Sequence, residues 1–477
     1  MANTSSHELW EQERQYIEQL RREKPEWFQS DEKLNPQRIL EHIGITALPT
    51  DRARGYYRLY LQDFIVEEVA LDGTVRTVIP EAPAPPLDAT DQRTLFFDLI
   101  KVGVFTLEAI QRLCETLQLE PKRVGHAGIK DAIAVTSQRI SLRNVKYEEL
   151  ASHSIPGLYL KNFSYGKGVV NVGELFGNRF TIFVRTEKPV GQNWLDQRLE
   201  KYRTNGFLNY YGVQRFGSRF SVHQFGRLVM QGKYVEALRM YLAGTNESEP
   251  PYFQAVRKKV QTLFEDGRAM LAEFQHFPYS FRNEIKVLEY LKQHPDDPIG
   301  ALACISEHTR LWVYAYVSYL FNKKLSDATI HGESLPETLP LLLSADPADR
   351  QPYASYLQAD QTENFLQYIK PFPFIRPAKR NVATIIKPDI HASRITPEGV
   401  ILSFTLPKGV YATTFLMHFF DLVSGQTVPD WVKTDEQDIL ELVGLGSIKP
   451  IKEVLGKYML SRLDLSGVAA ETNTVEE

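Results

Sequence analysis

A long helical stretch lies in the middle of this sequence and separates two regions that carry strand patterns. Between about residues 228 and 370, apolar residues recur at helical spacing over 233–242, 251–275 and 310–325. Strand patterns lie on either side, at about 178–185 and 400–406. We therefore expect a mixed α/β (α+β) fold whose last strands come from the C-terminal part of the chain, with a mainly helical domain inserted into it.

The chain is longer than one hydrophobic core usually serves. It has 477 residues, whereas single cores stop growing at roughly 250–300 residues. We predict four parts: a helical N-terminal extension over 1–50, with an amphipathic helix at 7–22; a discontinuous α/β domain over 51–228 and 371–465; an inserted domain over 229–370; and a disordered tail over 466–477.

Proline and capping signals add local detail. The proline-rich stretch 80–86 is expected to be a surface loop, as are the acidic, proline-broken segments 295–298 and 346–349. Thr106 is expected to cap a helix with one apolar face, formed by Leu107, Ile110, Leu113, Cys114 and Leu117.

The composition excludes several classes of protein. Two cysteines, Cys114 and Cys304, are too few for a disulfide framework or a cysteine-based metal site. They favour a reducing, cytoplasmic location. The N-terminal residues lack the apolar core of a signal peptide. The longest aromatic-aliphatic run, 311–321, is too short to span a bilayer, so no membrane partner is expected.

The net charge of −4 conceals two basic stretches. Residues 201–235 contain six lysines and arginines and no acidic residue, and residues 364–388 contain five and none. Aromatic residues are interleaved with these cations. Cations that follow phosphates, together with rings that stack on unpaired bases, suit a groove for RNA. A basic solvated face with core aromatics is an equally good interpretation of the same pattern.

Residues 126–142 combine a flexible turn, a charged pair and a strand pattern. Gly128 lets the backbone turn tightly and precedes Lys130 and Asp131. Alternating residues then predict a strand over 137–142. A carboxylate beside a lysine, on a loop held by a strand, is a plausible ionised nucleophile. On spacing alone, an ordinary turn aspartate beside a solvated lysine is the more common interpretation, because aspartate is frequent in turns.

Five blocks follow one another in the order typical of the TruD family of RNA pseudouridine synthases, and the chain resembles that family from about residue 55 to 416. The blocks are Asp63-Phe64-Ile65-Val66-Glu67-Glu68 (D-F-x-V-x-E); Ala127-Gly128-x-Lys130-Asp131 with Ala134-x-Thr136-x-Gln138; residues 173–185 (G-x-L-x-G-N-x-F-x-I-x-x-R); residues 209–217 (N-Y-Y-G-x-Q-R-F-G); and residues 404–413 (F-x-L-P-x-G-x-Y-A-T).

The resemblance implies a pseudouridine synthase catalytic domain with an inserted TruD-type domain. It implies an isomerase that converts a uridine, with tRNA as the substrate class, into pseudouridine. Asp131 matches the family's single catalytic aspartate. No cofactor and no metal are expected, because base and sugar stay in the site throughout the reaction.

The resemblance also implies substrate-binding residues. Tyr211 is the candidate for stacking on the flipped base and Asn209 for hydrogen bonding to its edge or to the sugar. Phe64 is a candidate for lining the same pocket, and Arg215 for binding a phosphate. Three further residues complete the predicted site: Arg58, where the family usually has a lysine; Lys130, as a cation that keeps Asp131 ionised; and Glu68, which would orient its neighbours.

Two other functions compete with this hypothesis. A catalytically weak RNA-binding or RNA-folding protein would retain the same surface without turnover. A nucleoside hydrolase would release free uracil instead of rejoining it to the sugar.

Overall fold

The structure is a computed structural model that describes residues 6–28, 36–86, 94–425 and 428–462. Its contacts divide the chain into two compact units. The sheet unit contains the described parts of 50–207 and 386–467, and the helical unit those of 1–49 and 208–385. The contacts thus group the N-terminal extension with the middle of the chain. The predicted domain boundaries stay a proposal, and the predicted tail 466–477 lies outside the described residues.

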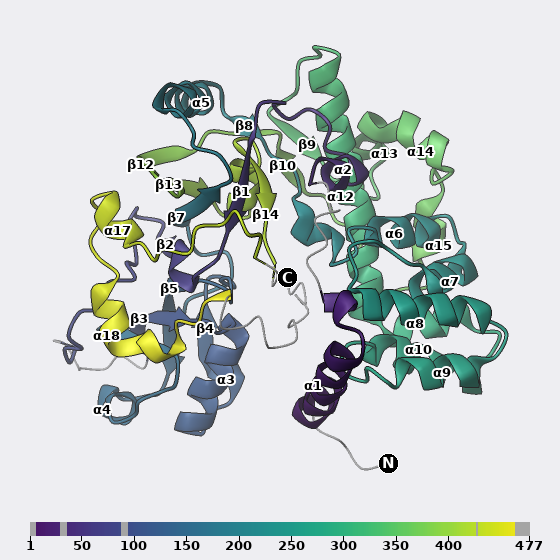
Figure 1. The fold of residues 1–477 in the computed structure, drawn as a ribbon, viewed down its shortest axis with the longest axis horizontal. Helices are drawn as coiled ribbons and strands as arrows, with labels where there is room; N and C mark the ends of the chain where they lie inside the picture. The colour runs from purple at the N-terminus through teal and green to yellow at the C-terminus, as the bar shows by residue number, and fades with distance from the viewer. Residues whose placement is uncertain (1–5, 29–35, 87–93, 426–427, 463–477) are drawn as a thin grey trace. The chain divides into compact units, whose positions relative to one another are not determined.

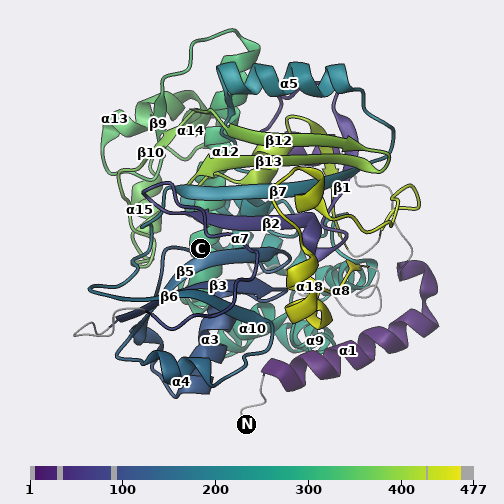
Figure 2. The ribbon, with the colours of Figure 1, turned by 90° about the vertical axis from the view of Figure 1, so that its left-hand side faces the viewer.

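A mixed ten-stranded sheet forms the centre of the sheet unit. Figure 2 looks onto its strands, which follow one another in the order β12-β13-β7-β2-β5-β3-β6. The strands are β1 (Ala53–Tyr57), β2 (Phe64–Val69), β3 (Thr94–Val102), β4 (Val124–His126), β5 (Val135–Arg143), β6 (Leu158–Gly166), β7 (Gly177–Thr186), β12 (Asp389–Thr396), β13 (Gly399–Pro407) and β14 (Phe420–Val423). The strands predicted at 178–185 and 400–406 are therefore present as β7 and β13, which pair with each other.

The register of three central strands determines which residues meet at one edge of the sheet. β2 is parallel to β5, with Ile65 opposite Val135. β3 is antiparallel to β5, with Val102 opposite Val135. The N-terminal ends of β2 and β5 and the C-terminal end of β3 therefore lie together. The segments that lead into or out of these three ends bring their side chains to the same edge.

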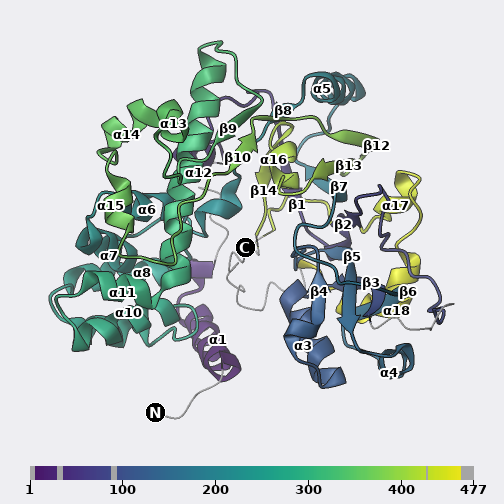
Figure 3. The same cartoon turned by 180° about the vertical axis from the view of Figure 1, so that it is seen from behind.

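Helices cover both faces of this sheet. Along β3, Ile100 belongs to a core cluster that includes α17 (Ile439–Leu442) and α18 (Lys449–Leu455). Its neighbour Leu99 belongs to a second cluster with α3 (Thr106–Leu117) and α4 (Tyr147–Ala151). Because successive strand residues point to opposite faces, the two clusters lie on opposite sides of the sheet, as the positions of α18 and α3 in Figures 1 and 3 show. The sheet unit also contains α5 (Gln192–Asn205) and α16 (Ala412–Leu416).

The helical unit is built around one apolar core. Its helices are α1 (Ser6–Glu23), α2 (Pro36–His42), α6 (Val222–Met230), α7 (Tyr234–Ala243), α8 (Pro251–Thr262), α9 (Gly267–Phe274), α10 (Arg282–Gln293), α11 (Pro298–Cys304), α12 (Ser306–Ile330), α13 (Pro347–Arg350), α14 (Ala354–Asp360) and α15 (Phe365–Ile369). A two-stranded ribbon joins β9 (Thr338–Pro340) to β10 (Asn381–Ala383). The short strands β8 (Phe207–Leu208) and β11 (Ile385–Ile386) lie where the chain passes between the units. The fold class is confirmed as mixed α/β.

The predicted N-terminal helix is present as α1 and packs on the helical unit. Ile17 and Leu20 are buried in that unit's core. The Tyr16 ring stacks on His276. The buried carboxylate of Glu13 accepts hydrogen bonds from the amides of residues 279 and 280, just before α10 begins. The extension is thus held by apolar packing and by a carboxylate that satisfies backbone donors near a helix start.

Two local predictions were wrong, and a third was right except at its last residue, for identifiable reasons. The helix predicted over 251–275 is divided into α8 and α9, because the Asp266 side chain caps a new helix by accepting from the amides of residues 268 and 269. The segments 295–298 and 346–349 are not wholly loops. Asp297 and Asp346 each cap a short helix that begins at the following proline, a position that proline favours.

The structure also bears on membrane association. Within the described ranges, no helix is both long enough and apolar enough to cross a bilayer.

Close packing of α6 on α12 generates the first testable prediction. A Cβ atom added to Gly226 would lie 1.9 Å from the carbonyl oxygen of Trp312, so Gly226→Ala must push the two helices apart. We expect a loss of about 1–3 kcal/mol in the free energy of unfolding, measured by chemical denaturation. Gly267→Ala is the matched control, because its Cβ meets nothing within 4 Å. Equal stability of the two variants would contradict this account of the packing.

Candidate active site

Asp131 lies at the sheet edge where β2 and β5 begin, four residues before β5. Its Oδ1 accepts a hydrogen bond of 2.6 Å from Nη2 of Arg58. The Asp131 side chain is 41% exposed and the Arg58 side chain 16%. A charge-assisted bond of this length holds the carboxylate in one position. The site thus presents a solvent-accessible carboxylate held by a mostly covered guanidinium.

Arg58 is itself held in an unusual position. Its backbone has φ +65°, in the left-handed region that non-glycine residues seldom occupy. Its guanidinium carbon lies 4.0 Å from the centre of the Phe64 ring, within the range of a cation–π contact. Phe64 is buried and lies under the guanidinium rather than at the surface. The structure therefore brings together three predicted site residues, Arg58, Phe64 and Asp131.

Lys130 has a different partner from the one predicted. Its ammonium lies 2.9 Å from Glu68 Oε2, and both side chains are buried. The cation on the Asp131 carboxylate is Arg58, so the predicted pairing of Lys130 with Asp131 was wrong. Lys130 thus faces inward, while Asp131 faces outward. Glu68 also accepts from the amide of Arg139 at 3.0 Å, an arrangement suited to the orienting role predicted for it.

Buried polar side chains hold the backbone of the Asp131 loop. Gln138 Nε2 donates to the carbonyl of Gly128 at 3.0 Å. Thr106 Oγ1 accepts from the amide of Lys130 at 2.9 Å and donates to Gln138 Oε1 at 3.0 Å. The expectation that Thr106 caps α3 was wrong, because Phe105 occupies the N-cap position and Thr106 is already the first residue of the helix. The Thr106 side chain bonds to this loop instead. Leu107 is likewise exposed rather than on the apolar face.

Sequence reasoning missed Lys101, the last polar residue of β3. It is fully buried, and its Nζ donates to the carbonyl oxygens of Val104, Lys130 and Asp131. The available signal was a lone lysine at the end of a mostly apolar stretch, 95–102. Such a residue is rarely buried without a specific partner.

Two other motif acids are structural. Asp63 is buried and lies 3.3 Å from Nη2 of Arg185. Burial raises the pKa of Asp63, and the charge of Arg185 opposes that rise. Glu67 pairs with Arg179 at 2.6 Å and accepts from the amide of Val78. These parts of the motifs therefore fix strand positions rather than supply groups for chemistry.

The other three predicted site residues lie together in the helical unit. Asn209 Nδ2 donates to the carbonyl of Ala383 at 2.9 Å. Asn322 holds the backbone of Tyr211 from both sides, accepting from its amide at 2.8 Å and donating to its carbonyl at 2.9 Å. The Tyr211 ring is 8% exposed, and the guanidinium carbon of Arg215 lies 5.3 Å from its centre.

The basic stretch 201–235 is not the exposed aromatic surface that its composition suggested. Most of its rings are buried: Tyr202, Phe207, Tyr210, Tyr211, Phe216 and Phe225. Arg219 is buried too. Its guanidinium donates to the carbonyls of Tyr241 and Gly244 and lies 3.8 Å from Glu249. The alternative interpretation, that these rings pack in the core, therefore describes them better.

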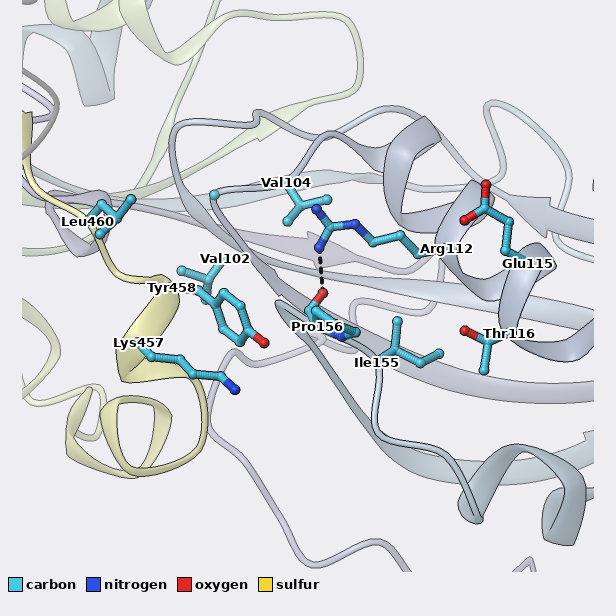
Figure 4. A pocket seen from close by; sticks show the side chains of 11 residues that line it. Val102, Val104, Arg112, Glu115, Thr116, Ile155, Pro156, Lys457, Tyr458 and Leu460 are labelled. Carbon is cyan, nitrogen blue, oxygen red and sulfur yellow. Dashed lines mark hydrogen bonds between the residues drawn. The ribbon is translucent and has the colours of Figure 1, made fainter. Parts of the chain in front are cut away.

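A pocket of about 550 Å³ lies beside the turn that follows Lys101. In Figure 4, Arg112 and Pro156 face Lys457 and Tyr458 across it. Nη1 of Arg112 donates to the Pro156 carbonyl at 2.6 Å, and Glu108 pairs with its Nη2 at 2.5 Å. Asp131 does not line this pocket, and the charge of Arg112 is already matched. The described residues contain no cluster of three histidine, cysteine or acidic side chains arranged to hold a metal ion.

Comparison with known proteins identifies the family. The model of the family "tRNA pseudouridine synthase D (TruD)" matches residues 43–344. A probable tRNA pseudouridine synthase D of Methanopyrus kandleri is 31% identical over 358 residues, which cover 70% of this chain and 86% of the relative. A probable tRNA pseudouridine synthase D 1 of Methanocaldococcus jannaschii is 28% identical, covering 77% of this chain and 95% of the relative.

A solved structure agrees with these relatives. The putative tRNA pseudouridine synthase D of Methanosarcina mazei covers 80% of this chain and 98% of its own, with a TM-score of 0.64 and 23% identity, and so supports the fold. Fold and motifs together place the chain in the class of pseudouridine synthases. It belongs to the TruD family, which confirms the resemblance seen in the sequence.

The loop anchors generate the second prediction. Thr106→Val keeps the shape of the side chain but removes the acceptor of the Lys130 amide and the donor to Gln138. We expect faster hydrogen exchange at that amide and a loss of about 1–3 kcal/mol in the free energy of unfolding. Thr116→Val, on the same helix and without such contacts, is the control. Unchanged exchange at Lys130 in Thr106→Val would contradict the anchoring role.

Proposed function

We propose that this protein isomerises a uridine of tRNA to pseudouridine, with Asp131 as the catalytic carboxylate. The observation that carries the proposal is the exposed Asp131 carboxylate, bound by Arg58 at 2.6 Å on a loop whose backbone is held from beneath. A nucleophile must be reachable and fixed at once, and this arrangement meets both needs. Membership of the TruD family supplies the reaction and its substrate class.

The reaction balances without any added reactant. The bond between N1 and C1′ breaks, the base turns, and a bond between C5 and C1′ forms. The hydrogen on C5 leaves as a proton, and N1 gains one. Asp131 either attacks C1′ or acts on the ribose while the base is detached, and Arg58 holds the carboxylate in place through its hydrogen bond. No oxidant, metal or cofactor enters this balance.

The target uridine must leave the base stack before Asp131 reaches it, at a cost of a few kcal/mol. Within the proposal, Asn209 and Tyr211 bind the base or sugar and Arg215 a phosphate, while Phe64 supports Arg58. The tight backbone hold of Asn322 on Tyr211 supports a positioned role for that ring. Both cysteines are free thiols, which accords with the cytoplasmic location that we propose.

Asp131→Asn tests the catalytic assignment. RNA with tritium at uridine C5 releases it to water when the new bond forms. We expect release from tRNA by the parent and none by the variant, because an amide is a far poorer nucleophile than a carboxylate. RNA affinity, measured by filter binding, should be nearly unchanged. Asp196→Asn, an exposed aspartate on α5, is the control and should retain full activity.

Other outcomes of the same assay identify the competing functions. Equal release by parent and Asp131→Asn would refute the catalytic role of Asp131. Tight binding without release by the parent would favour an RNA-binding protein. Free uracil in the chromatogram would indicate a hydrolase.

Arg58→Met tests the ion pair. Loss of a hydrogen bond between charged groups, worth about 1.5–3 kcal/mol, predicts that kcat falls by roughly 10- to 100-fold. Arg58→Lys should recover part of that loss, since it keeps the charge but not the planar fork. Arg54 lies on β1 and pairs with Glu187. Arg54→Met removes this pair, which is remote from the proposed chemistry, and should leave kcat unchanged. The same kcat in Arg58→Met and Arg54→Met would argue against the role given to Arg58.

A further inference from the structure

Lys101 is buried directly beneath the Asp131 loop. Its side chain has no exposed surface. Nζ donates to the carbonyl oxygen of Asp131 at 2.6 Å, to that of Val104 at 2.7 Å and to that of Lys130 at 3.2 Å. An ammonium group has three hydrogens and no acceptor. Its three donors are therefore matched by three backbone acceptors.

Two of these acceptors belong to consecutive residues. In an extended chain, successive carbonyl groups point in opposite directions. The carbonyls of Lys130 and Asp131 nevertheless converge on one Nζ atom. The ammonium therefore stabilises the local bend that carries the Asp131 carboxylate, while Thr106 and Gln138 hold the preceding part of the loop.

Burying the Lys101 ammonium has a desolvation cost. Burial lowers the pKa of Lys101 to about 7, an effect that the charge of Lys130 adds to and that of Asp131 opposes. Among the described residues, no carboxylate oxygen lies within ion-pair distance of Lys101. An apolar side chain would avoid this desolvation cost, but it would leave three carbonyl oxygens without their donor.

We infer that Lys101 is a positioning residue of the reaction, which fixes the Asp131 carboxylate by binding the backbone of its loop to the end of β3. The inference rests on the proposed function for its catalytic consequence. Its structural part, the anchoring of the loop, is measurable without any activity. Lys101 touches neither substrate nor reacting atoms, so its effect passes entirely through the placement of Asp131.

The chain provides a close control in Lys161. This lysine is also fully buried, on β6 next to β3, and its Nζ also has three oxygen partners, which belong to Thr77, Ile79 and Glu81. None of these belongs to the Asp131 loop. Lys161→Met therefore reports the general effect of removing a buried ammonium from this sheet.

The experiment compares Lys101→Met with Lys161→Met in the full-length protein. Both should lower the melting temperature. Lys101→Met should lower kcat for tritium release from tRNA at least tenfold with KM within twofold of the parent, and Lys161→Met should leave both constants near those of the parent. Hydrogen exchange at the amides of 129–132 should quicken in Lys101→Met alone. Lys101→Gln, whose neutral amide still donates, serves if Lys101→Met does not fold, and should show the same pattern.

Each remaining outcome overturns one specific statement. An unchanged kcat in Lys101→Met, or an equal fall in Lys161→Met, refutes the positioning role. A rise in KM alone would assign Lys101 to substrate binding instead. If the parent itself releases no tritium, the proposed function fails, and exchange at 129–132 then decides separately whether Lys101 anchors the loop.

Discussion

The pairing of carboxylates on β2 with cations on neighbouring elements is the constraint on which the sheet unit depends. β2 is entirely buried and contains Glu67 and Glu68. Glu67 meets Arg179 of β7, and Glu68 meets Lys130 of the loop before β5. A slip of one residue would turn both carboxylates to the wrong face, away from their cations. Since an unpaired buried charge costs several kcal/mol, these pairs fix the register that brings the ends of β2, β5 and β3 together.

That register explains how neighbouring residues acquire different tasks. Lys130 and Asp131 are adjacent in sequence, yet Lys130 is directed into the sheet toward Glu68, and Asp131 is directed outward to Arg58. The inward residue anchors and the outward residue is available for chemistry. The cation beside the carboxylate comes from the segment between β1 and β2 rather than from the loop itself. The backbone strain at Arg58 accords with a residue held in place for function.

The sequence predicted several elements because periodicity reflects which face is buried. It therefore located the helix α1 and the strands β7 and β13. It failed where the hydrogen-bond partners of a side chain are distant from it in sequence. Thr106 was expected from the sequence to cap a helix, yet its hydroxyl bonds to residues more than twenty positions away. An aspartate in a turn is too common to indicate a function by itself, so Asp131 was recognised only through its family motif. Lys101 was missed because its partners are backbone atoms of a loop that is distant in sequence. The aromatic residues of 201–235 show the same limit, because residue type alone does not distinguish a ring that packs in the core from a ring that stacks on a base.

The contrast between a fixed loop and an open carboxylate follows from these contacts. Lys101, Thr106 and Gln138 are fully buried, whereas Asp131 extends from the surface that they support. Polar groups beneath a loop restrict its backbone without covering its side chains, because they bind carbonyl and amide groups that face the sheet. A carboxylate held in this way needs little rearrangement when substrate arrives, and the cost of ordering it is met during folding rather than during catalysis. The buried polar groups beneath the loop are thus explained by the geometry that they maintain.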